Sequence, residues 1–403
     1  MMKTFVVGIK QLVLGLALAC GIVSAGASAQ TMATPARQAV LLDTSTGSIL
    51  FEKDADTAFP PASMSKLMTV YLAFDAIKQG ELQLDDEVIV SDEAWRTWNK
   101  DTGTIGRGGS TMFLRARDTV TVADLLRGII VLSGNDACVV LAEHMAGSHE
   151  IFVEWLNAKA VDLGMASSVF KNANGWPAEG HVMSARDLAT LSYRLSTDFP
   201  DLYPMFAERE YLYKNFTSNR YNRNPLLGRF PGADGLKTGH TEESGYGLAA
   251  SAEREGRRLV LVVGGLSSTS ERTRESQRLL QYGFRNFSHY PLFRAGETVD
   301  YAEVWLGETP TVPMVIGEDL AITMSRRQRA EMKVSVEYLN PVSAPIARGQ
   351  QVGDLIIELR GREPIRLPLL AGQAVDDVGG FGKIGAAFEY LLFGSAGAEN
   401  PAQ

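Results

Sequence analysis

Apolar positions along the chain follow two different rhythms, and the change between them falls near residue 290. Before it, runs with helical spacing lie between two groups of strand-like runs, at residues 38–51 and 246–264. After it come short alternating runs split by Pro and Gly, up to residue 377. This order predicts an α+β domain around a mostly antiparallel sheet, at residues 30–290, and a small all-β domain at 291–377.

Within the first region, the apolar spacing and the start and stop residues predict several helices. They are expected at residues 63–77, 121–132, 137–145, 151–163, from 184 onward, and 270–284. Pro60 and Pro61 precede the first helix, as helix-start residues often do. Residues 38–51 read as a hairpin around a turn that contains Gly47.

The N-terminal residues have the pattern of an export signal. Lys3 and Lys10 supply positive charge, residues 12–19 form a short apolar core, and Ala27-Ser28-Ala29 offers a small-residue cleavage site. A lipoprotein signal would use Cys20, but the residues before it fit that pattern poorly. We therefore expect residues 1–29 to be a signal peptide and the mature chain to act outside the cytoplasm.

The C-terminal residues 378–403 allow two interpretations. Residues 381–393 place five apolar side chains on one helical stripe, and a polar tail follows at 395–403. The stripe is typical of a terminal helix docked on its own domain and equally of an amphipathic segment that contacts the membrane surface. The residues alone do not separate these two interpretations.

The charge and the cysteine content of the chain limit the partners and the cross-links that we expect. The formal net charge of −8 over 403 residues argues against a nucleic-acid partner bound through its phosphates. Once the signal peptide is removed, Cys138 is the single remaining cysteine, so no internal disulfide is expected. Its apolar surroundings predict a small buried side chain rather than a nucleophile. No cofactor or metal is expected.

The segment Ser63-Met64-Ser65-Lys66 opens the first predicted helix. Residues three positions apart share a helix face, so the Ser63 hydroxyl and the Lys66 amine can meet. That is the arrangement of an activated nucleophile. Taken alone, the commoner explanation is a capping serine and a solvated lysine.

Two further motifs change this interpretation, and they follow in a fixed order. Ser133-Gly134-Asn135 lies between two predicted helices, and Lys237-Thr238-Gly239 lies later in the chain. Each is ordinary by itself, since Ser-Gly-Asn is common in turns. Together the three resemble the penicillin-recognising serine acyl-transferases, which are the penicillin-binding proteins and class A β-lactamases.

The residue types suit acyl transfer to Ser63. Lys66 can accept the Ser63 proton only when it is neutral, and burial beside the cation Lys237 would lower its pKa. Ser133 can pass a proton between Lys66, the leaving amine and Lys237. The amide of Asn135 has a donor and an acceptor with which to hold a substrate peptide.

The third motif supplies groups for binding. A substrate carboxylate can be held by a cation and two hydroxyls, from Lys237, Thr238 and Thr241. The strand edge at Gly239 and His240 lets a peptide pair alongside it, and a side chain at Gly239 would obstruct that approach. The oxyanion needs two backbone N–H donors, and Ser63 and His240 are the expected pair.

The chain closely resembles one family, the D-alanyl-D-alanine carboxypeptidases of peptidase family S11, which are low-molecular-mass penicillin-binding proteins of the type-5 and type-6 kind. Besides the motifs, the matching residues are Met112-Phe113-Leu114, Arg127-Gly128-Ile129, Asp136-Ala137-Cys138, Ser184-Ala185-Arg186-Asp187, Asp234-Gly235-Leu236, His240-Thr241, Gly264-Gly265, Arg272 and Arg348-Gly349-Gln350-Gln351-Val352-Gly353. The resemblance covers nearly the whole mature chain. It implies a penicillin-binding/β-lactamase-like transpeptidase domain, with helices on both sides of its sheet.

The resemblance also implies an activity and a location. The family removes the terminal D-alanine from peptidoglycan pentapeptides in the periplasm, is inhibited by β-lactams and is held at the inner membrane by a C-terminal helix. Ser63 would be the acylated nucleophile, Lys66 its base, and Ser133, Asn135 and Lys237 would complete the centre. His240 and Arg272 would contribute to the terminal-carboxylate end. From the residues alone, Arg272 reads as an exposed helix residue between Glu271 and Glu275.

Two departures from the family keep alternatives open. The stripe at 381–393 is shorter or less basic than the usual family anchor. The loop at Asn174–Val182 contains Glu179 but lacks the Glu-x-x-x-Asn pattern with which class A β-lactamases activate water, so slow release of a penicilloyl group is expected. The alternatives are a β-lactamase, a DD-endopeptidase that cuts cross-links, and a non-catalytic wall-binding protein.

Overall fold

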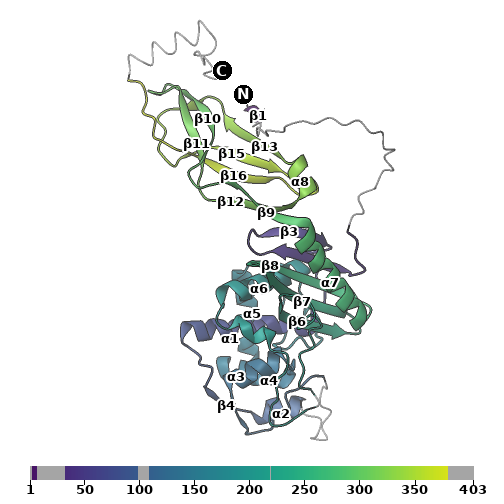
Figure 1. Ribbon diagram of the computed structural model, residues 1–403. Coiled ribbons are helices and arrows are strands. Elements are labelled where there is room, and N and C mark those ends of the chain that lie inside the picture. Colours follow the sequence, from purple (N-terminus) through teal and green to yellow (C-terminus); the bar gives the residue numbers. More distant parts are fainter. Residues whose placement is uncertain (1, 7–31, 99–108, 218, 380–403) are drawn as a thin grey trace, which may run out of the picture. The chain divides into compact units, whose positions relative to one another are not determined.

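The structure is a computed structural model that describes residues 2–6, 32–98, 109–217 and 219–379. The chain divides into two compact units (Figure 1). One unit is Ala29–Asn286, and the other is Phe287–Gln403 together with Met1–Ser28. Each is described by itself.

The first unit is built on a five-stranded antiparallel sheet. In spatial order its strands are β3 (Ser48–Lys53), β2 (Gln38–Asp43), β8 (Arg257–Leu266), β7 (Gly245–Arg254) and β6 (Ala233–Thr241). The hairpin from the start of the region joins the strands from its end, where Gln38 pairs with Gly264 and Asp43 with Leu259. Strand β6 is left at the edge of the sheet.

Helices and short elements fill the sequence between those strands. They are η1 (Ala62–Ser65), α1 (Lys66–Gln79), β4 (Glu87–Ile89), α2 (Asp92–Trp98), β5 (Thr119–Thr121), α3 (Val122–Ile130), α4 (Asn135–Ala146), α5 (His149–Asp162), α6 (Ala185–Asp198), η3 (Tyr203–Ala207) and α7 (Thr269–Asn286). Side-chain oxygens of Thr121, Ser148 and Ser184 cap the first turns of α3, α5 and α6, which fixes where these helices begin.

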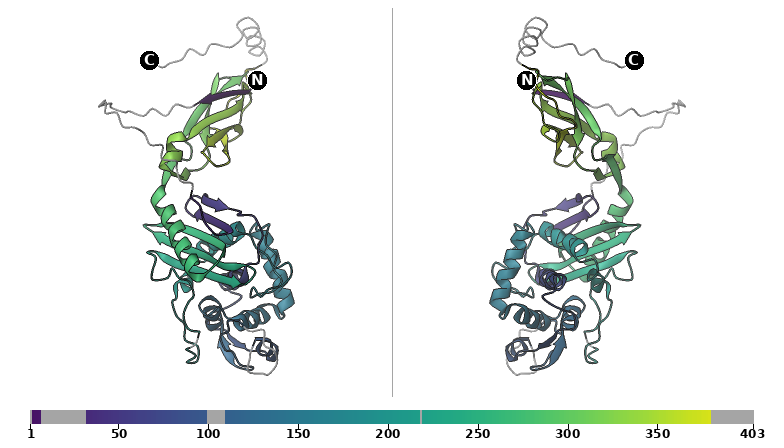
Figure 2. Two further views of the ribbon diagram at one scale, coloured as in Figure 1. Left: turned by 90° about the vertical axis from the view of Figure 1, so that its right-hand side faces the viewer. Right: turned by 90° about the vertical axis from the view of Figure 1, so that its left-hand side faces the viewer.

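Side chains alternate between the two faces of the sheet, and helices cover both faces. Val40 and Val260 join the large apolar core formed with α1, α3, α4 and α6. On the opposite face, a Cβ on Gly283 of α7 would lie 2.9 Å from Leu41 and 2.7 Å from Leu259, so α7 packs closely there. Figure 2 shows α7, in green, and the teal helices on opposite sides of the sheet. The predicted α+β class, with helices on both sides of an antiparallel sheet, is confirmed.

The second unit is β-rich, as predicted. Its larger sheet has the order β1 (Met2–Val6), β13 (Lys333–Leu339), β15 (Gln351–Glu358), β16 (Ile365–Ala371), β11 (Thr311–Ile316), β10 (Thr298–Trp305) and β14 (Val342–Ser343). A second pair joins β9 (Phe287–Phe293) to β12 (Leu320–Ser325). A separate apolar core holds this unit together.

Several elements of the second unit were not predicted. Strands β9 and β10 contain Pro291 and charged residues that weaken the alternating pattern, and α8 (Arg326–Glu331) interrupts the strands behind a capping box of Ser325 and Gln328. Strand β1 lies within the predicted signal peptide. Residues 381–393 and the tail at 395–403 lie outside the described residues. Among the helices that the structure describes, none is long and apolar enough to cross a bilayer.

Candidate active site

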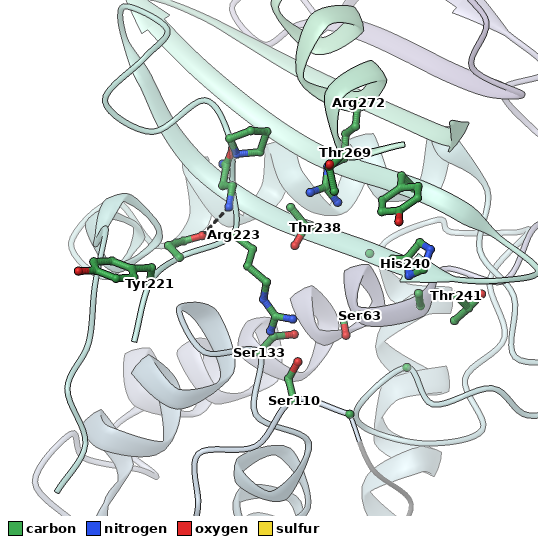
Figure 3. A pocket seen from close by; sticks show the side chains of 18 of the residues that line it. Ser63, Ser110, Ser133, Tyr221, Arg223, Thr238, His240, Thr241, Thr269 and Arg272 are labelled. Atoms are coloured by element: carbon green, nitrogen blue, oxygen red, sulfur yellow. Dashed lines mark hydrogen bonds between the residues drawn. The ribbon is translucent and has the colours of Figure 1, made fainter. Parts of the chain in front are cut away.

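The predicted site residues gather at one pocket of the first unit, with a volume of about 1240 Å³. Its lining comes from η1, the loops before α4 and around residue 175, the edge strand β6, helix α7 and residues 209–229. Figure 3 shows Ser63, Ser133 and Ser110 below the strand that carries Thr238, with Arg272 above it. Segments far apart in the sequence therefore meet around the Ser63 hydroxyl.

Lys66 lies beneath Ser63 and has no exposed surface. Its Nζ is 2.9 Å from Ser63 Oγ and 2.8 Å from Asn135 Oδ1, and it also donates to the Asn174 carbonyl oxygen. The alternative interpretation of a capping serine and a solvated lysine is wrong. Pro61 precedes η1 and Ser65 precedes α1, and neither makes a capping hydrogen bond with its side chain. Lys66 is buried.

The pKa of Lys66 is lowered to about 8, chiefly by burial. The positive charge of Arg223 lowers it further, while Cys138 and Asp136 raise it. We expected the positive charge of Lys237 to be the main cause of the lowered pKa of Lys66. Burial is the main cause instead. The pKa of Lys237 itself is lowered well below its ordinary value, by burial first and then by Arg223 and Lys66. Burial is thus the main cause of both lowered pKa values, and the charges of the two lysines also repel each other.

The Ser133-Gly134-Asn135 motif is held in shape by backbone hydrogen bonds. Ser133 has a φ of 61°, a left-handed conformation that is costly for a residue with a side chain. Gly134 N donates to Gly128 O at 2.8 Å, and Asn135 N donates to Ser110 O at 2.8 Å. Both motif side chains are buried at the pocket, where Asn135 Oδ1 accepts from Lys66.

Asp136, the next residue, anchors this motif to a neighbouring segment. Its buried carboxylate accepts hydrogen bonds from the backbone N–H groups of Met112, Leu114 and Ala137. Burial raises the pKa of Asp136, and these N–H donors oppose the rise. The start of α4 and residues 112–114 are thus tied together beside the pocket.

Gly239 brings β6 against the turn that carries Ser63. A Cβ at this position would lie 2.8 Å from Pro61 O, closer than packed atoms allow, and 3.1 Å from Met64 Cγ. The expected reason for this glycine, room for a substrate peptide, is therefore incomplete. The nearest obstruction is the backbone before Ser63, so Gly239 sets the distance between η1 and β6.

Thr238, His240 and Thr241 all line the pocket. The Thr241 N–H donates to Ser244 Oγ at 3.2 Å inside the hairpin, and successive residues of a strand direct their N–H groups to opposite sides. The N–H of His240 consequently faces the open edge of β6. The His240 ring packs against the Tyr246 ring at a tilt of 31°, with 3.9 Å between centroids, and the Thr241 hydroxyl contacts Ser244 Oγ at 2.7 Å.

Arg272 is buried at the same pocket, so the interpretation as an exposed helix residue is wrong. Its Nη1 is 3.4 Å from Gly247 O, and its Nε has no hydrogen-bond partner among the described residues. Burial and the charge of Arg223 lower its pKa to about 10. The neighbouring carboxylates are engaged elsewhere, since Glu271 accepts from Ser267 and Glu275 from Arg278.

Sequence reasoning missed Arg223, which reaches into the centre of the site. The residue is exposed at the rim, but its side chain extends to the loop before α4, where Nη2 donates to Leu132 O at 2.6 Å (Figure 3). Burial of that end lowers the pKa of Arg223. Its only signal in the sequence is a place in a polar, aromatic stretch at residues 211–223.

The arrangement suits acid–base and nucleophilic chemistry by side chains. Among the described residues, no group of three or more His, Cys, Asp or Glu side chains could hold a metal ion. Cys138 is fully buried, and burial raises the pKa of its thiol to about 12. Glu179 is exposed and lies outside the pocket lining.

Comparisons with known proteins find matches for both units of the chain. The profile of the peptidase S11 family, described as D-alanyl-D-alanine carboxypeptidase, matches residues 25–268, and that of the penicillin-binding protein 5 C-terminal domain matches residues 287–377. D-alanyl-D-alanine carboxypeptidase DacC of Escherichia coli (strain K12) is 37% identical over 366 residues, 90% of each chain.

Two solved structures extend the comparison. Penicillin-binding protein 5 from Haemophilus influenzae has a TM-score of 0.74 at 33% identity, covering 87% of this chain and 100% of that one. Penicillin-binding protein D2 from Listeria monocytogenes, in its ampicillin-bound form, has a TM-score of 0.55 at 28% identity, covering 63% and 99%.

Proposed function

The chain belongs to peptidase family S11, the D-alanyl-D-alanine carboxypeptidases, and from that premise we propose that it removes the terminal D-alanine from peptidoglycan pentapeptide stems through an acyl-enzyme on Ser63. Ser63 is the nucleophile and Lys66 is its base. Ser133, Asn135 and Lys237 complete the centre. The D-alanine leaves as a free amino acid, and water then hydrolyses the ester.

The observation that carries the proposal is the set of acceptors around Lys66. A neutral amine has two N–H donors and one lone pair, whereas the ammonium form has three donors. Asn135 Oδ1 and the Asn174 carbonyl take two donors, and Ser63 Oγ lies in the third direction at 2.9 Å. Once the amine is neutral, its lone pair faces the Ser63 hydroxyl. Burial makes that form accessible by lowering the pKa to about 8.

The steps after attack use neighbouring groups. The proton taken by Lys66 passes through the Ser133 hydroxyl to the leaving nitrogen, which general acid catalysis makes a better leaving group. The oxyanion accepts from the backbone N–H groups of Ser63 and His240. The open-edge direction of the His240 N–H supports this pairing, because donors fixed in place before reaction stabilise the developing charge.

The terminal carboxylate of the substrate binds between β6 and α7. Thr238, Thr241 and His240 line the pocket, and Lys237, the residue before Thr238 on β6, is buried. Arg272 supports this role most directly, because its buried Nε has no hydrogen-bond partner among the described residues. A bound carboxylate supplies the missing acceptor and compensates the buried positive charge.

Penicillins acylate the same serine in this proposal. The Listeria relative has been solved in an ampicillin-bound form. Release of the penicilloyl group is slow, because Glu179 is exposed and away from the pocket and no Glu-x-x-x-Asn pattern occurs in its loop. β-Lactams therefore inhibit the protein and are not efficiently destroyed by it.

The reaction takes place in the periplasm after removal of residues 1–29. Residues 30–290 carry the catalysis, and the β-rich residues 291–377 follow. Residues 381–393 contact the outer face of the inner membrane through their apolar stripe. Sedimentation with anionic vesicles tests this contact: the full mature chain should pellet and a chain ending at residue 380 should not. Equal pelleting of both would remove the membrane contact from the proposal.

One assay separates the proposed activity from a β-lactamase and from a non-catalytic wall-binding protein. The purified chain is incubated with a stem pentapeptide and, separately, with a chromogenic cephalosporin. Release of D-alanine with at most one cephalosporin opened per protein supports the carboxypeptidase. Many turnovers of the cephalosporin would indicate a β-lactamase. Absence of both reactions would indicate a non-catalytic wall-binding protein.

A further inference from the structure

The loop that carries Asn174 and Gly175 touches the surroundings of both reacting groups. Asn174 accepts a hydrogen bond from the buried Lys66 Nζ through its backbone carbonyl oxygen. Gly175 has a φ of 73° and packs against the turn that carries Ser63, where a Cβ would overlap the carbonyl oxygen of Ala62. The path of this loop therefore decides where one of the acceptors for Lys66 lies.

The side chain of Asn172 folds this loop. Its Oδ1 accepts hydrogen bonds from three successive backbone N–H groups, those of Asn174 at 3.3 Å, Gly175 at 2.7 Å and Trp176 at 3.1 Å. Its Nδ2 donates to the carbonyl oxygen of Trp176 at 2.8 Å. One amide suits such a turn because it has both an acceptor and donors. Residues 174–176 are thus wrapped around a single side chain.

One peptide plane connects Asn172 to Lys66. The carbonyl of Asn174 and the N–H of Gly175 belong to the same planar peptide unit, and in a trans unit they point in opposite directions. The N–H donates to Asn172 Oδ1 at 2.7 Å, so the carbonyl points away from Asn172 and accepts from Lys66. Rotation of this unit would move the carbonyl off Lys66, and the hydrogen bond to Asn172 opposes that rotation.

Other contacts fix the residue before this peptide unit. Thr69 Oγ1 donates to the Ala173 carbonyl oxygen at 2.6 Å, and Ala173 N donates to His149 Nε2 at 3.2 Å. Neither contact involves the unit between Asn174 and Gly175. The orientation of that unit consequently depends on Asn172 at its N–H end, while its carbonyl end meets the lysine.

We propose that Asn172 is a positioning residue for the reaction: it orients the Asn174 carbonyl, which in turn directs the lone pair of neutral Lys66 at Ser63. This role rests on the proposed function, because it concerns the same lysine and serine. Asn172 is not among the residues that line the pocket, so it acts through Asn174 and not by contact with substrate. A neutral amine that loses a fixed acceptor can turn about its Cε–Nζ bond, and its lone pair then leaves the Ser63 hydroxyl.

The chain contains a matched asparagine for the test. Asn157 of α5 holds the same segment at Phe170: its Oδ1 accepts from Phe170 N, and its Nδ2 donates to the carbonyl oxygens of Phe170 and Val153, each at 2.9 Å. Asn157 and Asn172 are both partly buried. Loss of Asn157 therefore removes comparable hydrogen bonds from the segment without acting on the peptide unit that meets Lys66.

The test measures acylation of the full mature chain by a fluorescent penicillin between pH 6 and 10, in wild type, N172A, N172S and N157A. On the high-pH plateau, where Lys66 is neutral, N172A should be at least about tenfold slower than wild type and N157A within about threefold, since a misplacement of about 1 Å costs up to about 10²-fold. N172S should recover part of the rate, because a hydroxyl accepts from the same N–H groups more weakly.

The midpoint of the pH profile is a second readout, which loss of stability alone does not move. The Asn174 carbonyl favours the charged form of Lys66 by accepting its hydrogen bond, so withdrawal of the carbonyl lowers the pKa. The midpoint of N172A should therefore fall below that of N157A. Thermal unfolding should show a similar loss of Tm in both variants.

Two results would overturn this role while the proposed function stands: a plateau rate in N172A equal to that in N157A, or a midpoint in N172A that equals or exceeds that of N157A. If N172A does not fold, N172S decides by the same two comparisons, with its plateau and midpoint expected below those of N157A. Wild type that is not acylated would overturn the proposed function as well.

Discussion

The Nζ of Lys66 lies 2.9 Å from the Oγ of Ser63, in a site where the lysine side chain has no contact with solvent. Two other oxygens, Oδ1 of Asn135 and the carbonyl oxygen of Asn174, also accept hydrogen bonds from Nζ. This relationship makes the protonation state of one amine decisive for the reactivity of one hydroxyl.

The rate of acylation should therefore rise with pH. Only neutral Lys66 accepts the Ser63 proton, and its pKa is about 8, so the rate climbs about tenfold per pH unit below 8 and levels off above it. Stopped-flow measurement of acylation by a fluorescent penicillin between pH 6 and 10 checks this. A rate that falls as pH rises through 8 would show that the charged form of Lys66 is the active one.

Replacing Arg223 should shift the pH dependence of the acylation rate to higher pH. In R223Q the positive charge that lowers the pKa of Lys66 is gone, so the pKa rises and the midpoint shifts to higher pH. The same stopped-flow profile measures the shift, and R274Q, at an exposed arginine of α7 outside the pocket, serves as the control. A midpoint that stays in place or moves to lower pH would mean that Arg223 does not act on Lys66.

Substitution of Gly239 should reduce acylation while the fold is kept. In G239A the new Cβ meets Pro61 O at 2.8 Å, so the turn that carries Ser63 must shift relative to β6. A misplacement of about 1 Å can cost roughly 10²-fold in rate. G317A, where the Cβ meets only the end of Leu370 at 3.3 Å, is the control. Wild-type acylation by G239A would contradict the spacing role of this glycine.

Arg272 should matter for binding of the substrate carboxylate. Loss of a hydrogen bond to a charged group costs about 1.5–3 kcal/mol, so R272Q should lose roughly 10- to 100-fold in kcat/KM for the pentapeptide. Most of this loss should appear in KM, measured from D-alanine release at varied pentapeptide concentration. R274Q, on the same helix and exposed, should behave as wild type. An unchanged KM in R272Q would remove Arg272 from the carboxylate end.

The sequence predicted the parts of this protein that depend on local spacing. The hairpin at residues 38–51, the helices between the strands and the approach of Ser63 to Lys66 all follow from periodicity and turn residues. The three motifs could be grouped because of their order and their resemblance to a family. Their meeting at one pocket depends on the pairing of β2 with β8, which joins distant parts of the chain.

What could not be predicted depends on burial and on long side chains that cross the pocket. Arg223 reaches Leu132 from a loop with no recognisable motif, and Arg272 is buried although acidic residues flank it in sequence. The lowered pKa of Lys66 was expected, but its cause was assigned to Lys237. Burial is the main cause, with the charge of Arg223 adding to it, and residue types alone do not reveal either.

The role of Ser63 as the nucleophile is tested most directly by locating the acyl group with mass spectrometry. The intact mature chain is treated with penicillin, digested, and searched for the penicilloyl adduct, with S63A and K66A in parallel. We predict one adduct on Ser63 in wild type, none in S63A, and an acylation rate in K66A lower by about 10²- to 10⁴-fold. An adduct on Ser133 or another residue, or labelling of S63A at the wild-type rate, would contradict this prediction.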